Sequence, residues 1–156
     1  MFLSNLADKQ ADIVNVPRAY IGQVEGEPGV QGVKDIPTLM LSPAMYFNYQ
    51  VSSGSVYFTA KPKLGGVDKL DLLGDKHMRK ALAHSLDYDK YLVDAFLGEA
   101  FQPATPIVKG LAQFNATKEK YHYSMALVQA ELEQAWVGAQ GPGTNAWTQG
   151  FYIPLT

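Results

Sequence analysis

Apolar and polar positions alternate with helical spacing along residues 75–98, the clearest pattern in the chain. One stripe repeats at positions i, i+4 and i+8 and consists of Met78, Leu82 and Leu86. This spacing predicts a half-buried helix. Asp87 comes next and is expected to cap a second helix, which carries a new apolar stripe and ends at Gly98. The pattern therefore predicts two short helices that meet at Asp87.

The segments before this pair show shorter patterns. The β-branched run at residues 11–16, a helix after Pro17 and the run at residues 30–34 predict a strand-helix-strand unit with a parallel pair. Residues 38–53 are dense in apolar and aromatic side chains and predict a core strand that Pro43 divides in two. We interpret Ser52 to Gly74, which contains a short run at residues 57–59, as an excursion that forms a β-hairpin or a loop.

A third helix is predicted after Ser124, whose hydroxyl is suited to cap it. Its stripe consists of Met125, Val128, Leu132, Ala135 and Trp136. A turn-rich connector at residues 138–150 leads to residues 151–156, which begin a strand. An apolar strand start at this position leads us to expect a piece of a larger protein.

Composition narrows the class of protein. The chain of 156 residues is 47% hydrophobic and 18% charged, which is typical of one globular domain spanning residues 1–156. A net charge of −2, with 13 basic residues scattered among 15 acidic ones, argues against a nucleic-acid surface. No apolar run approaches the roughly 18–20 residues that cross a bilayer. The chain has no cysteine, which removes disulfides and thiolate chemistry.

Candidate metal and catalytic groups are weak. His77 and His84 are seven residues apart, or about 10.5 Å along a helix, too far to share one ion, and His122 has no partner in sequence. The acidic residues of the second helix lack the glycine and closing glutamate of a calcium loop. The glycine-rich residues 138–145 lack the lysine of a phosphate loop. We expect no cofactor, no metal site and no enzyme, because no nucleophile elbow is present either.

An aromatic set invites two interpretations. The residues are Tyr46, Phe47, Tyr49, Tyr57 and Phe58. They line a ligand cleft in one interpretation, and they pack in the core in the other, which the general abundance of core aromatics favours.

The residues from Asp75 to Ile107 carry a family resemblance. The pattern consists of Asp75, Met78, Arg79, Ala81, Leu82, Asp87, Gly98, Pro103, Ala104, Pro106 and Ile107. It resembles the signature of the oligopeptide- and dipeptide-binding family of ABC-transporter solute-binding proteins. Residues 11–30, 46–50 and 121–136 are similar to neighbouring segments of that family. The chain departs from it at Ser124, where aspartate is usual, at Met78, where valine is commoner, and in a longer Ser52 to Gly74.

The resemblance implies a fold and a transport role. It implies an α/β fold with a mixed sheet flanked by helices, forming part of the second lobe of a two-lobed periplasmic-binding-protein-like fold. Such a protein is periplasmic or extracellular and membrane-associated, binds peptides or similar oligomeric solutes without catalysis, and delivers them to an ABC permease. An oligosaccharide or nickel-chelate ligand, or a free-standing protein-interaction domain, are the alternatives.

The resemblance also points to ligand-facing positions in two segments. They are Tyr46, Asn48, Pro103, Thr105 and Pro106. An aromatic plane offers sequence-tolerant contact area, and a proline-stiffened loop presents its backbone at low entropic cost. These positions are expected to contribute shape and not charge to recognition.

Overall fold

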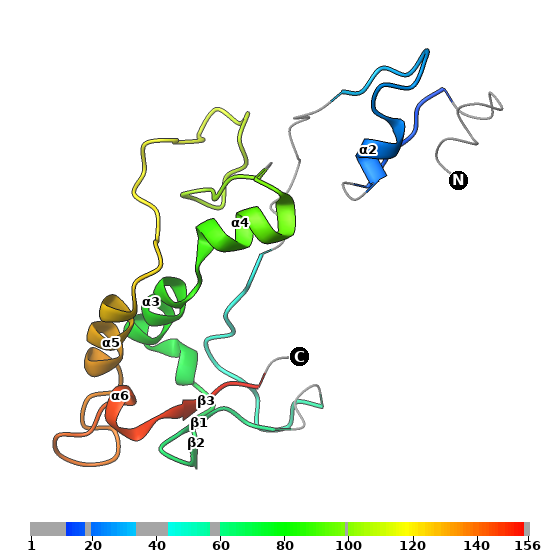
Figure 1. Cartoon of the computed structure of the whole chain (residues 1–156). Coiled ribbons are helices and arrows are strands. Elements are labelled where there is room, and N and C mark those ends of the chain that lie inside the picture. The colour runs from blue at the N-terminus through cyan, green and yellow to red at the C-terminus, as the bar shows by residue number, and fades with distance from the viewer. Residues whose placement is uncertain (1–11, 18–19, 34–43, 57–59, 99, 155–156) are drawn as a thin grey trace. The chain divides into compact units, whose positions relative to one another are not determined.

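The computed structural model describes residues 12–17, 20–33, 44–56, 60–98 and 100–154. The chain divides into two compact units, one made of residues 1–40 and 107–114 and the other of residues 41–106 and 115–156. The second unit holds most of the regular structure (Figure 1). The described elements mix helices with a small sheet, which agrees with the expected α/β class. The expectation of one domain over residues 1–156 stays a prediction.

The first unit contains the short helix α2, Ile21–Val24. A turn leads into it, in which the Tyr20 amide donates to the Pro17 carbonyl at 2.9 Å, and Val24 is buried. The predicted helix is thus confirmed, but the predicted strands beside it are wrong within residues 12–16 and 30–33, which form no strand. The helix between them has only 4 residues, about one turn, and so offers little apolar surface to cover a parallel pair.

Residues 44–53 do not form the predicted core strand. Val51 is buried and its amide donates to the Leu70 carbonyl at 2.8 Å, but Tyr46 is 87% exposed. The high apolar content of this segment therefore reflects local anchoring and exposed aromatics, not burial along a strand. Residues 38–43 and 57–59, which complete the strand predictions of this region, lie outside the described residues.

The sheet has three strands in the order β2-β1-β3. Strand β1, Lys63–Leu64, pairs with β2, Val67–Asp68, and with β3, Phe151–Tyr152. Gly65 and Gly66 join β1 to β2 with φ angles of 55° and 84°, the left-handed pair of a tight hairpin turn that glycine adopts without strain. Of the two alternatives expected for Ser52 to Gly74, the structure has a hairpin, and the strand predicted to begin at residue 151 is confirmed. Both pairings are antiparallel, so the described sheet is not the mixed sheet we expected.

The two helices predicted on either side of Asp87 are present. The 3-10 turn η2, Leu72–Gly74, precedes α3, Lys76–Ser85, and α4 follows at Tyr88–Phe96. The Asp87 carboxylate accepts a hydrogen bond from the Lys90 amide at 3.0 Å, as expected of a cap. Leu97 and Gly98 end α4 in the left-handed region, with φ angles of 53° and 77°.

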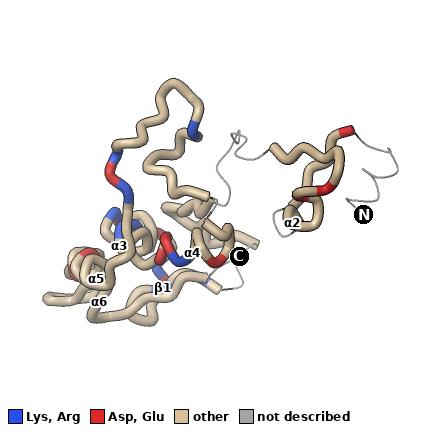
Figure 2. The backbone as a smooth tube through the Cα atoms, turned by 45° about the horizontal axis from the view of Figure 1, so that its top comes forward, with Lys and Arg blue, Asp and Glu red and all other residues tan. Residues whose placement is uncertain are grey.

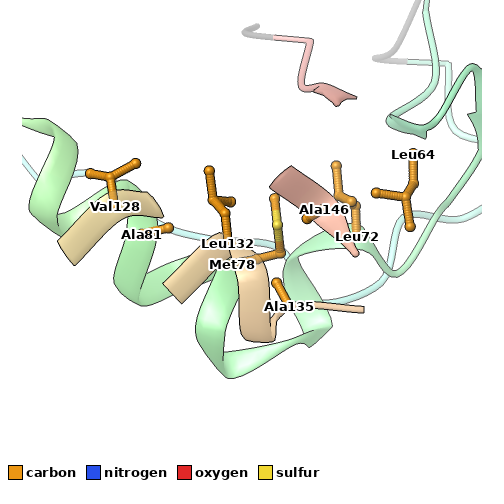
Figure 3. Packing of buried hydrophobic residues seen from close by; sticks show 8 residues of the cluster. All are labelled: Leu64, Leu72, Met78, Ala81, Val128, Leu132, Ala135 and Ala146. Atoms are coloured by element: carbon orange, nitrogen blue, oxygen red, sulfur yellow. The ribbon is translucent and has the colours of Figure 1, made fainter. Parts of the chain in front are cut away.

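Helix α5, Met125–Gln134, and the short α6, Ala146–Gln149, complete the second unit. The Ser124 hydroxyl accepts from the Leu127 amide at 3.3 Å, which confirms the predicted cap. Helices α3 and α5 pack together, and buried side chains of both meet residues of the sheet region, η2 and α6 in one cluster (Figure 3). The cluster consists of Leu64, Leu72, Met78, Ala81, Val128, Leu132, Ala135 and Ala146.

Helix α4 differs from the other long helices because it has no buried residue. Its apolar stripe is present in sequence, yet Tyr91 is 38% exposed and Leu86, just before the helix, is 42% exposed. The Tyr91 and Phe96 rings contact each other edge to face, with centroids 5.6 Å apart. Spacing predicts which residues share a face of α4, but no residue of that face is fully buried within the described part of the chain.

Replacing Met78 by Ala tests the core. Met78 is fully buried where α3 meets α5, so its truncation leaves a cavity and should lower the free energy of unfolding by about 2–5 kcal/mol. Met125→Ala is the matched control, because Met125 is 54% exposed, and it should change stability by less than about 0.5 kcal/mol. Urea unfolding followed by circular dichroism measures both. Equal losses would contradict this assignment of the core.

Candidate functional site

Tyr46 and Asn48, two of the predicted ligand-facing residues, lie on the irregular segment 44–50. The Tyr46 ring is almost fully solvent-exposed. Asn48 is exposed as well, and its side-chain oxygen accepts a hydrogen bond from the Gln50 amide at 3.3 Å. This segment therefore presents an aromatic plane and an amide side chain to solvent.

The other three predicted residues lie in the loop that follows α4. Pro103 and Thr105 are half-buried and Pro106 is exposed. The neighbouring Gln102 side chain donates to the Tyr121 carbonyl at 2.8 Å, which ties this loop to the residues before α5. The five predicted residues thus occupy two segments of the second unit, and their role in ligand binding stays a prediction.

Arg79 anchors the segment that carries Tyr46 and Asn48. Its guanidinium donates to the carbonyls of Leu73 and Gly74 at 2.7 and 2.8 Å. The same group lies over the Tyr49 ring, 4.4 Å from the centroid, as in a cation–π contact. Sequence analysis identified Arg79 as part of the signature but did not find its partner, because the contact joins residues thirty positions apart.

Asp75 connects the start of α3 to the end of α5. One carboxylate oxygen accepts from the amides of His77 and Met78 at 2.7 and 3.3 Å, and the other accepts from the Trp136 amide at 3.2 Å. The Trp136 indole donates to the Leu72 carbonyl at 3.0 Å. The ammonium of Lys69 covers the Trp136 ring at 3.6 Å from its centroid. Asp75 was predicted only as a signature residue, and its cross-chain partner was missed.

A polar cluster of α3 and α5 side chains lies beside this core. The Nδ1 atom of His77 is 2.6 Å from one Glu131 carboxylate oxygen, and the Lys80 ammonium is 3.4 Å from the other. Burial disfavours ionisation of Glu131, but the His77 hydrogen bond and the Lys80 charge outweigh it and hold the pKa of Glu131 below its usual value. These contacts hold α3 and α5 together.

The positions of the histidine and acidic side chains also bear on metal binding. No group of three or more His, Cys, Asp or Glu side chains is arranged to hold a metal ion within the described part of the chain. Figure 2 shows acidic and basic residues interspersed along the chain, in keeping with the small net charge. The contacts around Asp75, Arg79 and Glu131 hold elements of the second unit together.

No protein-family model matches this chain, and neither a curated protein nor a solved structure gives a significant match. Among the described residues, no helix combines the length and apolar character that crossing a bilayer requires.

Replacing Asp75 by Ala tests the link between α3 and α5. The change removes a helix cap and leaves the Trp136 amide without its acceptor, so we expect a loss of about 1–3 kcal/mol in unfolding free energy. Asp89→Ala is the control, because Asp89 is an exposed residue in the first turn of α4. Urea unfolding should leave that variant within about 0.5 kcal/mol of the parent chain. If the Asp75→Ala variant were as stable as the control, Asp75 would not be the residue that links α3 to α5.

Acid titration tests the Glu131 cluster. Because its pKa in the folded chain is lowered, Glu131 contributes stability that is complete above the ordinary glutamate pKa of about 4.3 and is lost as pH falls through the lower folded value. The stability difference between the parent chain and Glu131→Gln should therefore be largest near neutral pH and shrink in acid. Urea unfolding from neutral pH into this acid range measures it. A difference independent of pH would contradict the assignment.

Proposed function

We propose that this chain is part of the second lobe of an exported solute-binding protein, which binds peptides or similar oligomeric solutes and delivers them to an ABC permease. The observation that supports the proposal is the local role of four signature residues between Asp75 and Gly98. Asp75 and Asp87 cap successive helices, Arg79 anchors the preceding turn, and Gly98 follows the end of the second helix. The signature thus coincides with a self-consistent set of local structures.

The segment around Tyr46 supports a ligand-contact role. Its ring is exposed, yet Tyr49, three residues later, is held against Arg79, and Val51 is hydrogen-bonded to Leu70. Anchoring on one side reduces the conformational entropy that the segment loses when a ligand orders it. An exposed aromatic on an anchored segment can provide contact area to ligands of varied sequence.

The loop after α4 supports the same role. Pro103 and Pro106 restrict the backbone, and the Gln102 contact with the Tyr121 carbonyl fixes the start of the loop. Thr105 and Pro106 then lie on a loop that is attached to the helical core but contributes little to it. We infer that both segments recognise shape and backbone, because neither Tyr46 nor the residues 102–107 carry a formal charge.

Mass spectrometry of molecules that copurify with the exported protein containing this chain tests the proposal. A ladder of short peptides is the expected result. A copurifying sugar or metal chelate would keep the transport role and replace the solute class. Denatured samples and a mock purification identify molecules that adhere nonspecifically. A protein partner in place of any small solute would favour an interaction domain and overturn the proposal.

Replacing Tyr46 by Ala in the same protein tests the aromatic contact. Loss of a stacking surface should weaken binding of the copurified solute by about tenfold, corresponding to roughly 1.4 kcal/mol, while the unfolding free energy stays unchanged because Tyr46 is exposed. Tyr123→Ala is the matched control, since Tyr123 is an exposed tyrosine of another segment and should bind normally. Calorimetric titration measures both, and unchanged affinity in Tyr46→Ala would refute this role.

A further inference from the structure

The turn at residues 115–117 carries a sequence pattern that neither the core nor the ligand-contact segments use. It reads Asn115-Ala116-Thr117, which has the form Asn-x-Ser/Thr with a residue other than proline in the middle. Asparagines stand at positions 5, 15, 48, 115 and 145, and only Asn115 has a serine or threonine two positions later. This form is the acceptor sequence for attachment of a glycan to asparagine. A three-residue pattern also arises by chance, so its weight depends on where the structure places it.

The structure brings the two side chains that define this pattern into direct contact. The Asn115 Oδ1 atom accepts a hydrogen bond from the Thr117 hydroxyl at 2.8 Å and another from the Thr117 amide at 2.9 Å. A backbone amide can only donate, so the Asn115 atom that it meets must be the oxygen. The carboxamide nitrogen, Nδ2, therefore lies on the other side of this planar group, and it makes no hydrogen bond to any other described residue. The nitrogen that would receive a glycan is thus left unoccupied.

The turn is also accessible to an enzyme. Every residue from 115 to 123 is exposed, and residues 100–124 contain no helix or strand. Such a segment can enter the active site of a transferase without loss of helix or strand hydrogen bonds. The buried cluster has no member between positions 82 and 127, so a glycan at Asn115 displaces none of its side chains.

We propose that Asn115 is an acceptor site for an N-linked glycan, transferred from an oligosaccharide carried on a lipid diphosphate. In this step, Nδ2 forms a bond to the anomeric carbon of the first sugar, and the bond between that carbon and a diphosphate oxygen breaks. The lipid diphosphate leaves, and Nδ2 loses one proton to a base of the transferase. The inference rests on the export in the proposed function, because this acceptor pattern is used in secreted proteins.

Mass spectrometry of the exported protein, purified from the cells that make it, tests the site. Cleavage after Lys109 and Lys118 releases residues 110–118, which contain a single asparagine, Asn115. We expect this peptide to carry a glycan in the parent protein and none in Asn115→Gln. Only unmodified peptide in the parent protein would overturn the inference. A glycan that persists on this peptide in Asn115→Gln would be attached to another residue and would overturn it too.

Two substitutions of Thr117 test the contact with its hydroxyl. Thr117→Val keeps the shape of the side chain but removes the hydroxyl, so the fraction of chains with a glycan should fall at least roughly tenfold. Thr117→Ser is the matched control, because it keeps a hydroxyl at this position and should retain the glycan. Asn115 and Thr117 are exposed, so circular dichroism should show the parent fold in every variant. An undiminished glycan in Thr117→Val would mean that the pattern does not direct the modification, and it would overturn the inference.

The glycan is detected without any measurement of solute binding. A ladder of copurified peptides without a glycan on Asn115 would overturn this inference and leave the proposed function in place. A glycan on Asn115 without a copurified solute would support this inference, while the solute-binding role would lose its support.

Discussion

A single carboxylate, that of Asp75, fixes the relation between the two helices that form most of the core. Its first oxygen receives two amides at the start of α3, and its second receives the Trp136 amide just past the end of α5. Free amides at a helix start must find acceptors, and Asp75 satisfies them while also holding a second helix. Trp136 has a φ of 51°, a conformation unusual for a bulky residue, and its indole hydrogen bond to Leu72 helps to retain it there. The buried cluster of α3, α5 and α6 can then form around Met78 and Leu132.

Three of the signature residues act mainly in folding. Asp75, Arg79 and Asp87 place helices and turns, whereas the residues proposed to meet a ligand are on irregular segments attached to that frame. This division is common, because rigid elements position loops and loops contact ligands. Arg79 connects the helical frame to one of these irregular segments, because its side chain extends from α3 and contacts the Tyr49 ring.

Long-range polar contacts complement a small core. His77 and Glu131 are separated by 54 residues, and His84 and the His122 carbonyl by 38. Each connects α3 to α5 or to the chain before it. The His77–Glu131 contact is partly buried and is worth more than exposed ion pairs such as Lys90 with Asp94, which solvent screens.

The sequence by itself determined helices α2, α3, α4 and α5, the caps at Asp87 and Ser124 and the end of α4 near Gly98, because each depends on chemistry within a few residues. It did not locate the short α6, and it left a hairpin and a loop open for Ser52 to Gly74. Tertiary structure alone decided which apolar stripes were buried: Met78 is enclosed where α3 meets α5, while the similar stripe of α4 has no buried residue. It also decided that residues 44–53 form no strand, since a strand requires a partner that local sequence does not specify. The partners of Asp75, Arg79 and His84 were likewise beyond sequence reasoning, because contacts across tens of residues depend on how the whole chain packs.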